Sequence, residues 1–324
     1  MGKVINLVAD IGGTNIRLGI ANSISNVEHL TVFQCAKYDG LADVVRHYLD
    51  SLSIEGDITV NACFAIACPV ENDLIKMTNL PWSFSKSALK KELKLNKFIL
   101  INDYTAIAHA VPYLSDDQKV QVGRGKAVKD KPISICGPGT GLGVANVIPD
   151  HNKWISIGGE GGHVDFGPVN DTEIGILQQL SKKYHHVSYE QLLSGLGLEQ
   201  IFQSLNAMDK KDVQQLSAKE ITEKALSGTC PLCEKTLNVF CQVLGSFAGN
   251  LALTFGSYGG VYIAGGIVPR FIDFVKESNF RSRFEEKGRL SDFNFTIPTF
   301  VITEAQPGIL GASAYLYQDN EEEL

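Results

Sequence analysis

The 324-residue chain lacks the features that mark several classes of protein. Aspartate and glutamate outnumber lysine and arginine, 36 to 29, and the net charge of −7 argues against nucleic acid as a partner. We find no cluster of basic residues with interleaved aromatics. No apolar run has the length expected of a membrane span, and the N-terminus enters a strand-like run without the layout of a signal peptide. We therefore expect a cytoplasmic protein that binds neither nucleic acid nor membrane.

The cysteines do not form the pattern of a disulfide framework. There are seven, an odd number, and most stand among apolar neighbours, which predicts buried and reduced thiols. One close pair occurs, Cys230-Pro231-Leu232-Cys233. A zinc knuckle needs a second pair at suitable spacing, and a redox motif is expected beside a βαβ unit. We therefore favour a structural pair at the start of a helix.

Two familiar nucleotide-binding loops are also missing. Nowhere does Gly-x-x-x-x-Gly-Lys lead into Ser or Thr, so there is no Walker A loop. The glycine-rich loops that do occur are followed by strand-like segments, whereas the dinucleotide fingerprint opens a helix.

What the chain has instead is a strand, glycine turn, strand unit that occurs twice. The apolar run 4–9 leads into Asp10 and the turn 12–15, and the apolar run 133–136 leads into the turn 137–143. Glycines bring bare N–H groups close to phosphate oxygens, and Asp10 could hold a divalent cation through water. Either turn alone could be a plain hairpin. Their repetition favours a nucleotide-phosphate site built by duplication.

The rest of the chain alternates strand-like and helix-like segments, which indicates an α/β fold with mixed sheets. The predicted strands are 18–24, 30–35, 58–70, 98–101, 133–136, 144–148, 154–157, 260–263 and 298–302. The predicted helices are 41–52, 85–93, 106–114, three that are capped by Asn170, Ser188 and Ser217, the long run 234–255, one that starts at Pro269, and 309–317. The tail from Asn320 is expected to be solvated. The polar stretch 115–128 suggests a boundary, with a small domain of 1–113 completed by a C-terminal helix in 304–324, and a large domain of 114–303.

Four further places carry chemistry suited to a ligand. Asp103, after a buried strand, is either a helix cap or a catalytic carboxylate. Four glycines surround Glu160 and are followed by His163, which favours a loop lying against a ligand over an exposed turn. Glu190 follows Ser188 with one residue between them, and an acid at this point of a helix start also suits the helix dipole. The glycines after strand 260–263 allow close backbone approach, either to an adenine or in tight packing.

Taken in order, five loops resemble the phosphate-1, connect, phosphate-2, sugar and adenosine motifs of the hexokinase/actin/heat-shock-protein ATPase superfamily. They are residues 10–17, 101–106, 137–145, 158–166 and 259–271. Within that superfamily, Gly-Glu-Gly-Gly-His-Val-Asp-Phe and Ala-Gly-Gly-Ile-Val-Pro-Arg-Phe are similar to the bacterial-type glucokinase family. Related ROK proteins carry a zinc-binding cysteine cluster after the shared histidine. Here Val-Asp-Phe-Gly-Pro follows, which favours the zinc-free branch.

The resemblance implies two actin-like ATPase domains, of the ribonuclease H-like kind, around a central cleft. It implies phosphorylation of glucose by ATP with Mg²⁺, with Asp103 as the general base and Asp10 orienting the metal through water. The sugar-binding residues it implies are Asn102, Asp103, Glu160, His163 and Glu190. The ATP-binding residues it implies are Asp10, Gly12, Gly13, Thr14, Asn15, Gly139, Thr140, Gly141, Gly265 and Gly266.

Three other functions stay open at this point. One is a kinase for another hexose or an amino sugar on the same scaffold. The second is a sugar-sensing regulator, in which we would expect an added DNA-binding helix-turn-helix or the loss of the catalytic base. The third is a filament-forming actin-like ATPase, which leaves the Glu160 and His163 string without a purpose. A homodimer is the default assembly because dimers are the commonest.

Overall fold

The computed structural model describes residues 3–54, 56–77, 80–209 and 215–320. They form two compact units. Unit 1 comprises Met1–Ser115, His151–Ser156 and Glu304–Leu324, and unit 2 comprises Asp116–Asp150 and Ile157–Thr303. The tail that we predicted to be solvated lies, beyond residue 320, outside the described residues.

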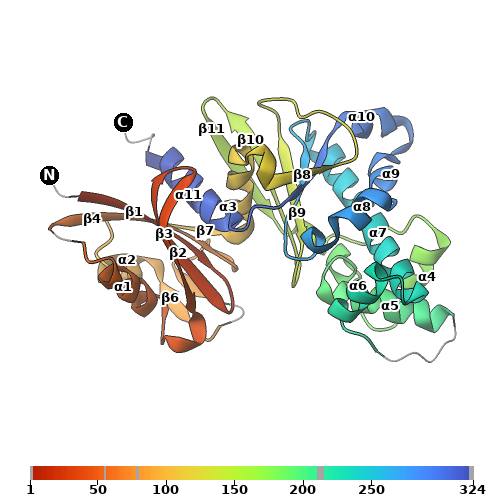
Figure 1. Cartoon of the computed structure of the whole chain (residues 1–324), viewed down its shortest axis with the longest axis horizontal. Helices are drawn as coiled ribbons and strands as arrows, with labels where there is room; N and C mark the ends of the chain where they lie inside the picture. Colours follow the sequence, from red (N-terminus) through yellow and green to blue (C-terminus); the bar gives the residue numbers. More distant parts are fainter. Residues whose placement is uncertain (1–2, 55, 78–79, 210–214, 321–324) are drawn as a thin grey trace. The chain divides into compact units, whose positions relative to one another are not determined.

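Unit 1 is built on a five-stranded mixed sheet in the order β3-β2-β1-β4-β7 (Figure 1). Its strands are β1 (Lys3–Ile11), β2 (Asn15–Ser23), β3 (Asn26–Gln34), β4 (Ile58–Ile66) and β7 (Lys97–Asn102). The first three run antiparallel, while β4 and β7 run parallel to β1. The carboxyl ends of β1, β4 and β7 therefore share one edge of the sheet.

Helices cover both faces of this sheet. They are α1 (Leu41–Ser51), α2 (Lys86–Glu92), α3 (Asp103–Ala110) and α11 (Pro307–Asn320), with the 3₁₀ turns η1 (Cys35–Lys37) and η2 (Val111–Tyr113). Alternate residues of β1 divide between the faces, as a strand requires. Leu7 packs with Val44 of α1, whereas Val8 packs with Ala106 of α3 and Ala312 of α11.

Unit 2 repeats this plan. Its sheet has the order β11-β10-β9-β12-β13-β8. The strands are β8 (Lys119–Val122), β9 (Ile133–Pro138), β10 (Leu142–Asp150), β11 (Lys153–Gly159), β12 (Val261–Ile263) and β13 (Thr299–Ile302). The first part of β11, up to Ser156, is counted with unit 1. As in unit 1, a hairpin is followed by two strands parallel to its first strand, and β8 is an addition. This shared topology agrees with the duplication that the two glycine turns predicted.

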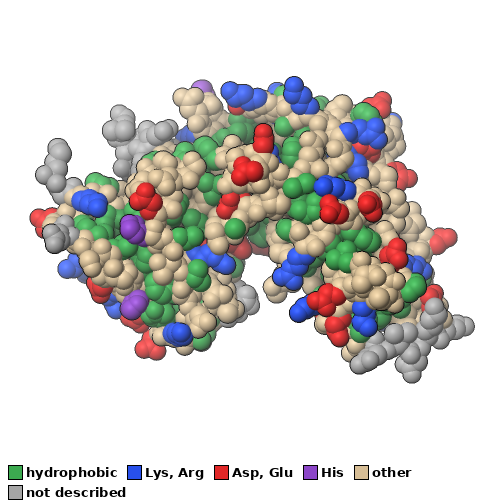
Figure 2. All heavy atoms as spheres, in the orientation of Figure 1, with side chains coloured by type: hydrophobic (Ala, Val, Ile, Leu, Met, Phe, Trp, Pro, Cys, Tyr) green, Lys and Arg blue, Asp and Glu red, His purple; other side chains and the backbone are tan. Residues whose placement is uncertain are grey.

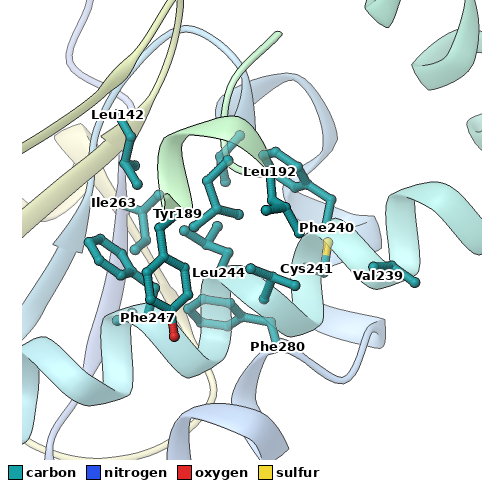
Figure 3. Close-up of a cluster of buried hydrophobic side chains, with 14 of the residues drawn as sticks. Leu142, Tyr189, Leu192, Val239, Phe240, Cys241, Leu244, Phe247, Ile263 and Phe280 are labelled. Carbon is teal, nitrogen blue, oxygen red and sulfur yellow. The ribbon is translucent and has the colours of Figure 1, made fainter. Parts of the chain in front are cut away.

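The helices of unit 2 build a large apolar core. They are α4 (Asp171–Leu180), α5 (Gly195–Met208), α6 (Ala218–Leu226), α7 (Pro231–Phe255), α8 (Ile272–Glu277), α9 (Phe280–Glu285) and α10 (Ser291–Thr296). The 3₁₀ turns are η3 (Asp116–Gln118), η4 (Gly161–His163), η5 (Tyr189–Gln191), η6 (Val268–Phe271) and η7 (Gly288–Leu290). Side chains of α7 such as Leu244 and Phe247 meet Leu142 of β10 and Tyr189 of η5 in this core (Figure 3).

Helix α7 corrects one expectation from the sequence. By length and composition it could cross a membrane, although we found no run of that length. Of its most apolar stretch, 78% is buried inside the structure, which is also the property of a core helix in a soluble protein. The polar residues Thr236, Ser246 and Asn250 interrupt the apolar sequence of this helix, so it did not stand out as one long apolar run.

Most predicted helix starts are confirmed by hydrogen bonds. Ser85, Asn170 and Ser217 each accept an N–H at the start of α2, α4 and α6, and such caps contribute about 1 kcal/mol each. The Ser188 prediction was wrong. Ser188 makes no cap hydrogen bond and precedes only the short turn η5, whereas Ser194 caps the long helix α5.

Two strand predictions also need correction. The predicted strand 58–70 ends at Ile66, where the chain bends. No sequence pattern predicted β5 (Leu74–Lys76) and β6 (Ser83–Ser85), which pair in a small sheet of their own. Strands of three residues are too short to show an alternating pattern.

Candidate functional site

In unit 1 the β1–β2 turn lies at the carboxyl edge of the sheet. The Gly12 N–H donates to the Asn15 carbonyl at 3.0 Å and closes the turn. The N–H of Cys35 donates to the Thr14 carbonyl, which ties the turn to η1. Thr14 itself is exposed, and neither Gly12 nor Gly13 has a positive φ. Glycine is therefore not required here by backbone conformation, and its absence of a side chain leaves the turn open to a ligand.

Asp10 stands at the end of β1, directly before this turn. It lies opposite Arg17 of β2 in the hairpin, and Nη1 of Arg17 is 3.4 Å from Oδ2 of Asp10. Burial raises the pKa of the Asp10 carboxyl, and the charge of Arg17 opposes that rise. A Cβ at Gly308, in the first turn of α11, would lie 2.9–3.2 Å from the carboxyl atoms. Glycine at position 308 thus lets the start of α11 come close to Asp10.

Asn102 and Asp103 lie two strands away from Asp10 on the same edge. The strand register places Asp10 opposite Ala65 of β4, and Ala65 opposite Ile101 of β7. Two strand spacings are about 10 Å. Asn102 is the N-cap of α3, and its Oδ1 accepts the Tyr104 N–H at 2.9 Å. The cap that we considered for Asp103 is therefore made by its neighbour.

Asp103 occupies the first position of α3 and is mostly buried. Burial raises the pKa of its carboxyl to about 6, and the nearby charge of Asp10 adds to the rise. A hydrogen bond from the Tyr104 N–H, whose nitrogen is 3.0 Å from Oδ1, acts in the other direction and lowers the pKa of Asp103. A carboxylate with a pKa close to neutral pH can both take and return a proton, which is what a general base must do.

The donor set of unit 1 fits a magnesium ion. Mg²⁺ binds through one or two carboxylates, keeps several waters and takes phosphate oxygens as further ligands. The charge of Asp10 contributes to the raised pKa of Asp103, and a bound cation would oppose that contribution. Within the described part of the chain, no group of three or more metal-ligating side chains occurs, so a closed protein cage is not offered.

In unit 2 the turn 139–141 joins β9 to β10. The Gly139 N–H donates to the Gly141 carbonyl at 2.8 Å, and the Gly139 carbonyl accepts from Gly195 at the start of α5. Gly265 follows β12 with a φ of +85°, and a Cβ there would lie 2.3 Å from the Pro138 carbonyl oxygen. Only glycine satisfies both the φ and the contact. Gly266, by contrast, has open space where a Cβ would stand.

The glycine-rich string after β11 lies against β10. A Cβ at Gly162 would be 2.1 Å from the Leu142 carbonyl oxygen, so the backbones are in direct contact. This contact presents the side chains of Glu160 and His163 at the surface, where both are exposed. His186 bonds to the His163 carbonyl at 2.8 Å and helps to hold the loop.

Glu190 joins the two loops of unit 2. Its Oε2 accepts the Leu142 N–H at 2.9 Å, just beyond the glycine turn, and lies 3.8 Å from Nε2 of His163. A Cβ at Gly141 would be only 2.5 Å from the same oxygen. The dipole interpretation of Glu190 was wrong, because its carboxylate is directed to β10 rather than to a helix start.

The structure therefore assembles the predicted residues into two groups, one in each unit. Asp10, Asn102, Asp103 and the turn 12–15 belong to unit 1, and the remaining predicted residues belong to unit 2. Sequence reasoning assigned nothing to Arg17, Gly195 or Gly308. Arg17 lies within the phosphate-1 motif, residues 10–17. Its charge, opposite to that of Asp10 across the predicted hairpin, could have indicated that the two side chains pair. Nothing local marks Gly195 or Gly308.

Comparison with known proteins decides the family. The family model described as glucokinase matches residues 7–319. The chain belongs to the glucokinase family. A glucokinase from Colwellia psychrerythraea is 57% identical over 321 residues, covering 98% of this chain and 97% of that protein. A glucokinase from Photorhabdus laumondii is 46% identical, covering 98% of each.

Solved glucokinases share the fold. The crystal structure of glucokinase from an Antarctic psychrotroph has a TM-score of 0.90 and 36% identity, covering 97% of this chain and 99% of that one. A Balamuthia mandrillaris glucokinase solved with glucose has a TM-score of 0.75 at 21% identity, covering 97% of this chain and 93% of that one. These matches confirm the expected actin-like ATPase class of α/β fold with two mixed sheets.

Proposed function

We propose that this glucokinase transfers the γ-phosphoryl group of ATP to the 6-hydroxyl of glucose with Asp103 as the general base. Phosphorylation of glucose is the activity of the family. The assignment of Asp103, of the sugar-binding residues and of magnesium is our proposal. The observation that carries it is the mostly buried Asp103 carboxyl at a sheet edge, with a pKa raised to about 6.

In the reaction, ionised Asp103 accepts the proton of the 6-hydroxyl as that oxygen forms its bond to the γ-phosphorus and the bond to the bridging oxygen of ADP breaks. Asn102 stays fixed beside it through its cap hydrogen bond. Above pH 6 the carboxylate is mostly ionised before glucose binds. The base is then ready without a separate proton-transfer step.

The sugar-binding assignment covers five residues. Asn102 and Asp103 of unit 1, with Glu160, His163 and Glu190 of unit 2, hydrogen-bond the hydroxyls. Glu190 has a second task, because its carboxylate also accepts the N–H that follows the glycine turn. A movement of that turn would therefore alter sugar binding.

The phosphates of ATP are assigned to the two glycine turns. Gly12, Gly13, Thr14 and Asn15 supply one set of backbone and hydroxyl donors, and Gly139, Thr140 and Gly141 supply the other. Gly265 and Gly266 lie near the adenosine. Asp10 would hold Mg²⁺ through water, and the ion would neutralise charge on the phosphates. We further expect a cytoplasmic homodimer.

A coupled assay with a panel of hexoses tests the function. The purified chain, with ATP and Mg²⁺, should phosphorylate glucose with a kcat/KM well above that for mannose, fructose or N-acetylglucosamine. A preference for another hexose or an amino sugar would support the alternative kinase. Sugar binding without turnover would support the regulator.

A further inference from the structure

The glucokinase reaction leaves Cys230 and Cys233 without a role. Cys230 is the N-cap of α7, a helix of 25 residues, and its Sγ accepts the Cys233 N–H at 3.3 Å. This confirms a pair at a helix start. We disfavoured a redox motif because no βαβ unit was evident. The chemistry, however, requires only a thiol at a helix N-terminus with a second thiol one turn on.

The two thiols differ in ionisation. Burial disfavours the thiolate of Cys230, but hydrogen bonds from the Cys233 thiol and from backbone N–H groups, aided by the charge of Lys224, hold the pKa of Cys230 below its ordinary value. Burial, together with the contact to Cys230, raises the pKa of Cys233 to about 12. The first cysteine is thus prepared to attack, and the second stays protonated until the first has reacted.

The two thiols also differ in access. Cys230 is partly exposed, and the residues before it, 226–229, are exposed, as is Pro231. Cys233 is buried in the core of unit 2. The remaining cysteines of the chain share this burial: Cys35, Cys63, Cys68, Cys136 and Cys241. A reagent in solution therefore meets Cys230 first.

We propose that Cys230 and Cys233 form a redox-active dithiol that exchanges with small disulfides such as glutathione disulfide. The Cys230 thiolate attacks one sulfur of glutathione disulfide, forms a mixed disulfide and releases one glutathione thiolate, which takes up a proton. The Cys233 thiol then loses its proton and attacks Sγ of Cys230, and the second glutathione leaves. The protein loses two hydrogens, and one glutathione disulfide becomes two molecules of glutathione.

The test follows glutathione on the intact chain. The fully reduced protein is incubated with glutathione disulfide in the absence of oxygen, quenched with acid, alkylated and analysed by peptide mass spectrometry. The wild-type protein should yield a Cys230–Cys233 disulfide. Cys233→Ala should retain one glutathione on Cys230, because the resolving thiol is gone. Cys230→Ser keeps a good helix cap and should take up none.

The five buried cysteines are internal controls, and Cys230 should react at least about tenfold faster than any of them, as expected for a more ionised thiol. Absence of glutathione from Cys233→Ala would overturn the proposal. So would equal uptake by Cys230→Ser, or a wild-type mixed disulfide that never closes. Stoichiometric zinc that blocks the reaction would also overturn it, in favour of a metal site.

Discussion

The two units share a sheet topology but place different chemistry at the equivalent turn. In unit 1 the turn stands beside Asp10, whose pKa is raised by burial, and the same edge carries Asp103. In unit 2 the turn is braced by Glu190, whose carboxylate accepts a backbone N–H from β10. One scaffold thus holds two carboxyls with raised pKa values in one unit and, in the other, a carboxylate that accepts a backbone N–H. Under the proposed function, unit 1 would supply the base for proton transfer, and both units would contribute residues that bind the substrates.

On the face shown in Figure 2, lysine and arginine side chains are interspersed with aspartate and glutamate, without a large patch of one sign. The contrast between Asp103 and Glu190 lies in burial and hydrogen bonding at the individual side chains, which substitutions can test one at a time.

The largest effect should come from Asp103→Asn. Because Asn102 makes the helix cap, the change leaves the start of α3 intact, and the amide cannot take a proton. Turnover should fall by roughly 10²–10⁴-fold, the usual contribution of a positioned base. A variant that retains more than about a tenth of wild-type turnover would remove Asp103 from this role.

The same variant should be more stable, which separates loss of the base from misfolding. The Asp103 pKa is about 6 in the folded chain against 3.8 in an unperturbed carboxyl, so its ionisation opposes folding above pH 6. Asparagine removes that penalty, a gain of roughly 1–3 kcal/mol in the free energy of unfolding at pH 7 to 8. The gain should disappear as the pH falls below about 4, because the wild-type side chain is then neutral in both states. Urea denaturation at both pH values measures it.

The pH dependence of the wild-type enzyme should show the same group. Since the base must be ionised, kcat/KM for glucose should fall as the pH decreases through about 6, approaching tenfold for each further pH unit. Steady-state rates between pH 5 and 8 test this, with circular dichroism to show that the chain stays folded. A profile that is flat from pH 7 to 5 would contradict it.

A smaller effect is expected in unit 2 from Gly141→Ala. The new Cβ would meet Oε2 of Glu190 at 2.5 Å and displace that side chain, which is flexible, so little stability should be lost. The KM for glucose should rise roughly threefold to tenfold, the equivalent of about one hydrogen bond. Gly195→Ala is the matched control, because its Cβ would have no neighbour closer than 3.8 Å. Equal KM values for the two variants would argue against Glu190 as a sugar ligand.

The smallest effect on turnover should come from replacing both Cys230 and Cys233 with alanine. Neither belongs to the proposed site, so kcat should stay within about twofold of wild type, while loss of the helix cap and of buried volume costs roughly 1–2 kcal/mol of stability. Thermal denaturation beside the coupled assay measures both. Activity that is lost on chelation of a bound zinc ion would contradict this prediction.

Much of the fold follows from local sequence signals. The caps at Ser85, Asn170 and Ser217 each accept the N–H three residues further on, so their residue types suffice to predict them. Ser188 and Ser194 carry similar local signals, but Ser188 forms a β-bridge with Asp165, and the neighbouring Glu190 contacts Leu142. Local patterns cannot report such a contact.

The candidate site shows the same limit. Residue types at the strand ends predicted the carboxylates and the glycine turns, because phosphates and a sugar proton require that chemistry. The contacts that tune them join distant segments, as between Gly308 and Asp10 or between Gly265 and Pro138. The pKa of Asp103 depends on burial and on Asp10, neither of which is visible in its own strand.

The division between the units is tested most directly by measuring kcat and the glucose Kd of Asp103→Asn and Glu160→Gln side by side. Calorimetry gives the Kd and the coupled assay gives kcat for each preparation. We expect opposite patterns. Asp103→Asn should lose turnover by a factor of at least about 10² and keep its glucose Kd within a few fold, whereas Glu160→Gln should weaken glucose binding more than it lowers kcat. If Asp103→Asn lost glucose binding and kept its turnover at saturating sugar, the carboxylate would be a sugar ligand only, and the proposed base would lie elsewhere.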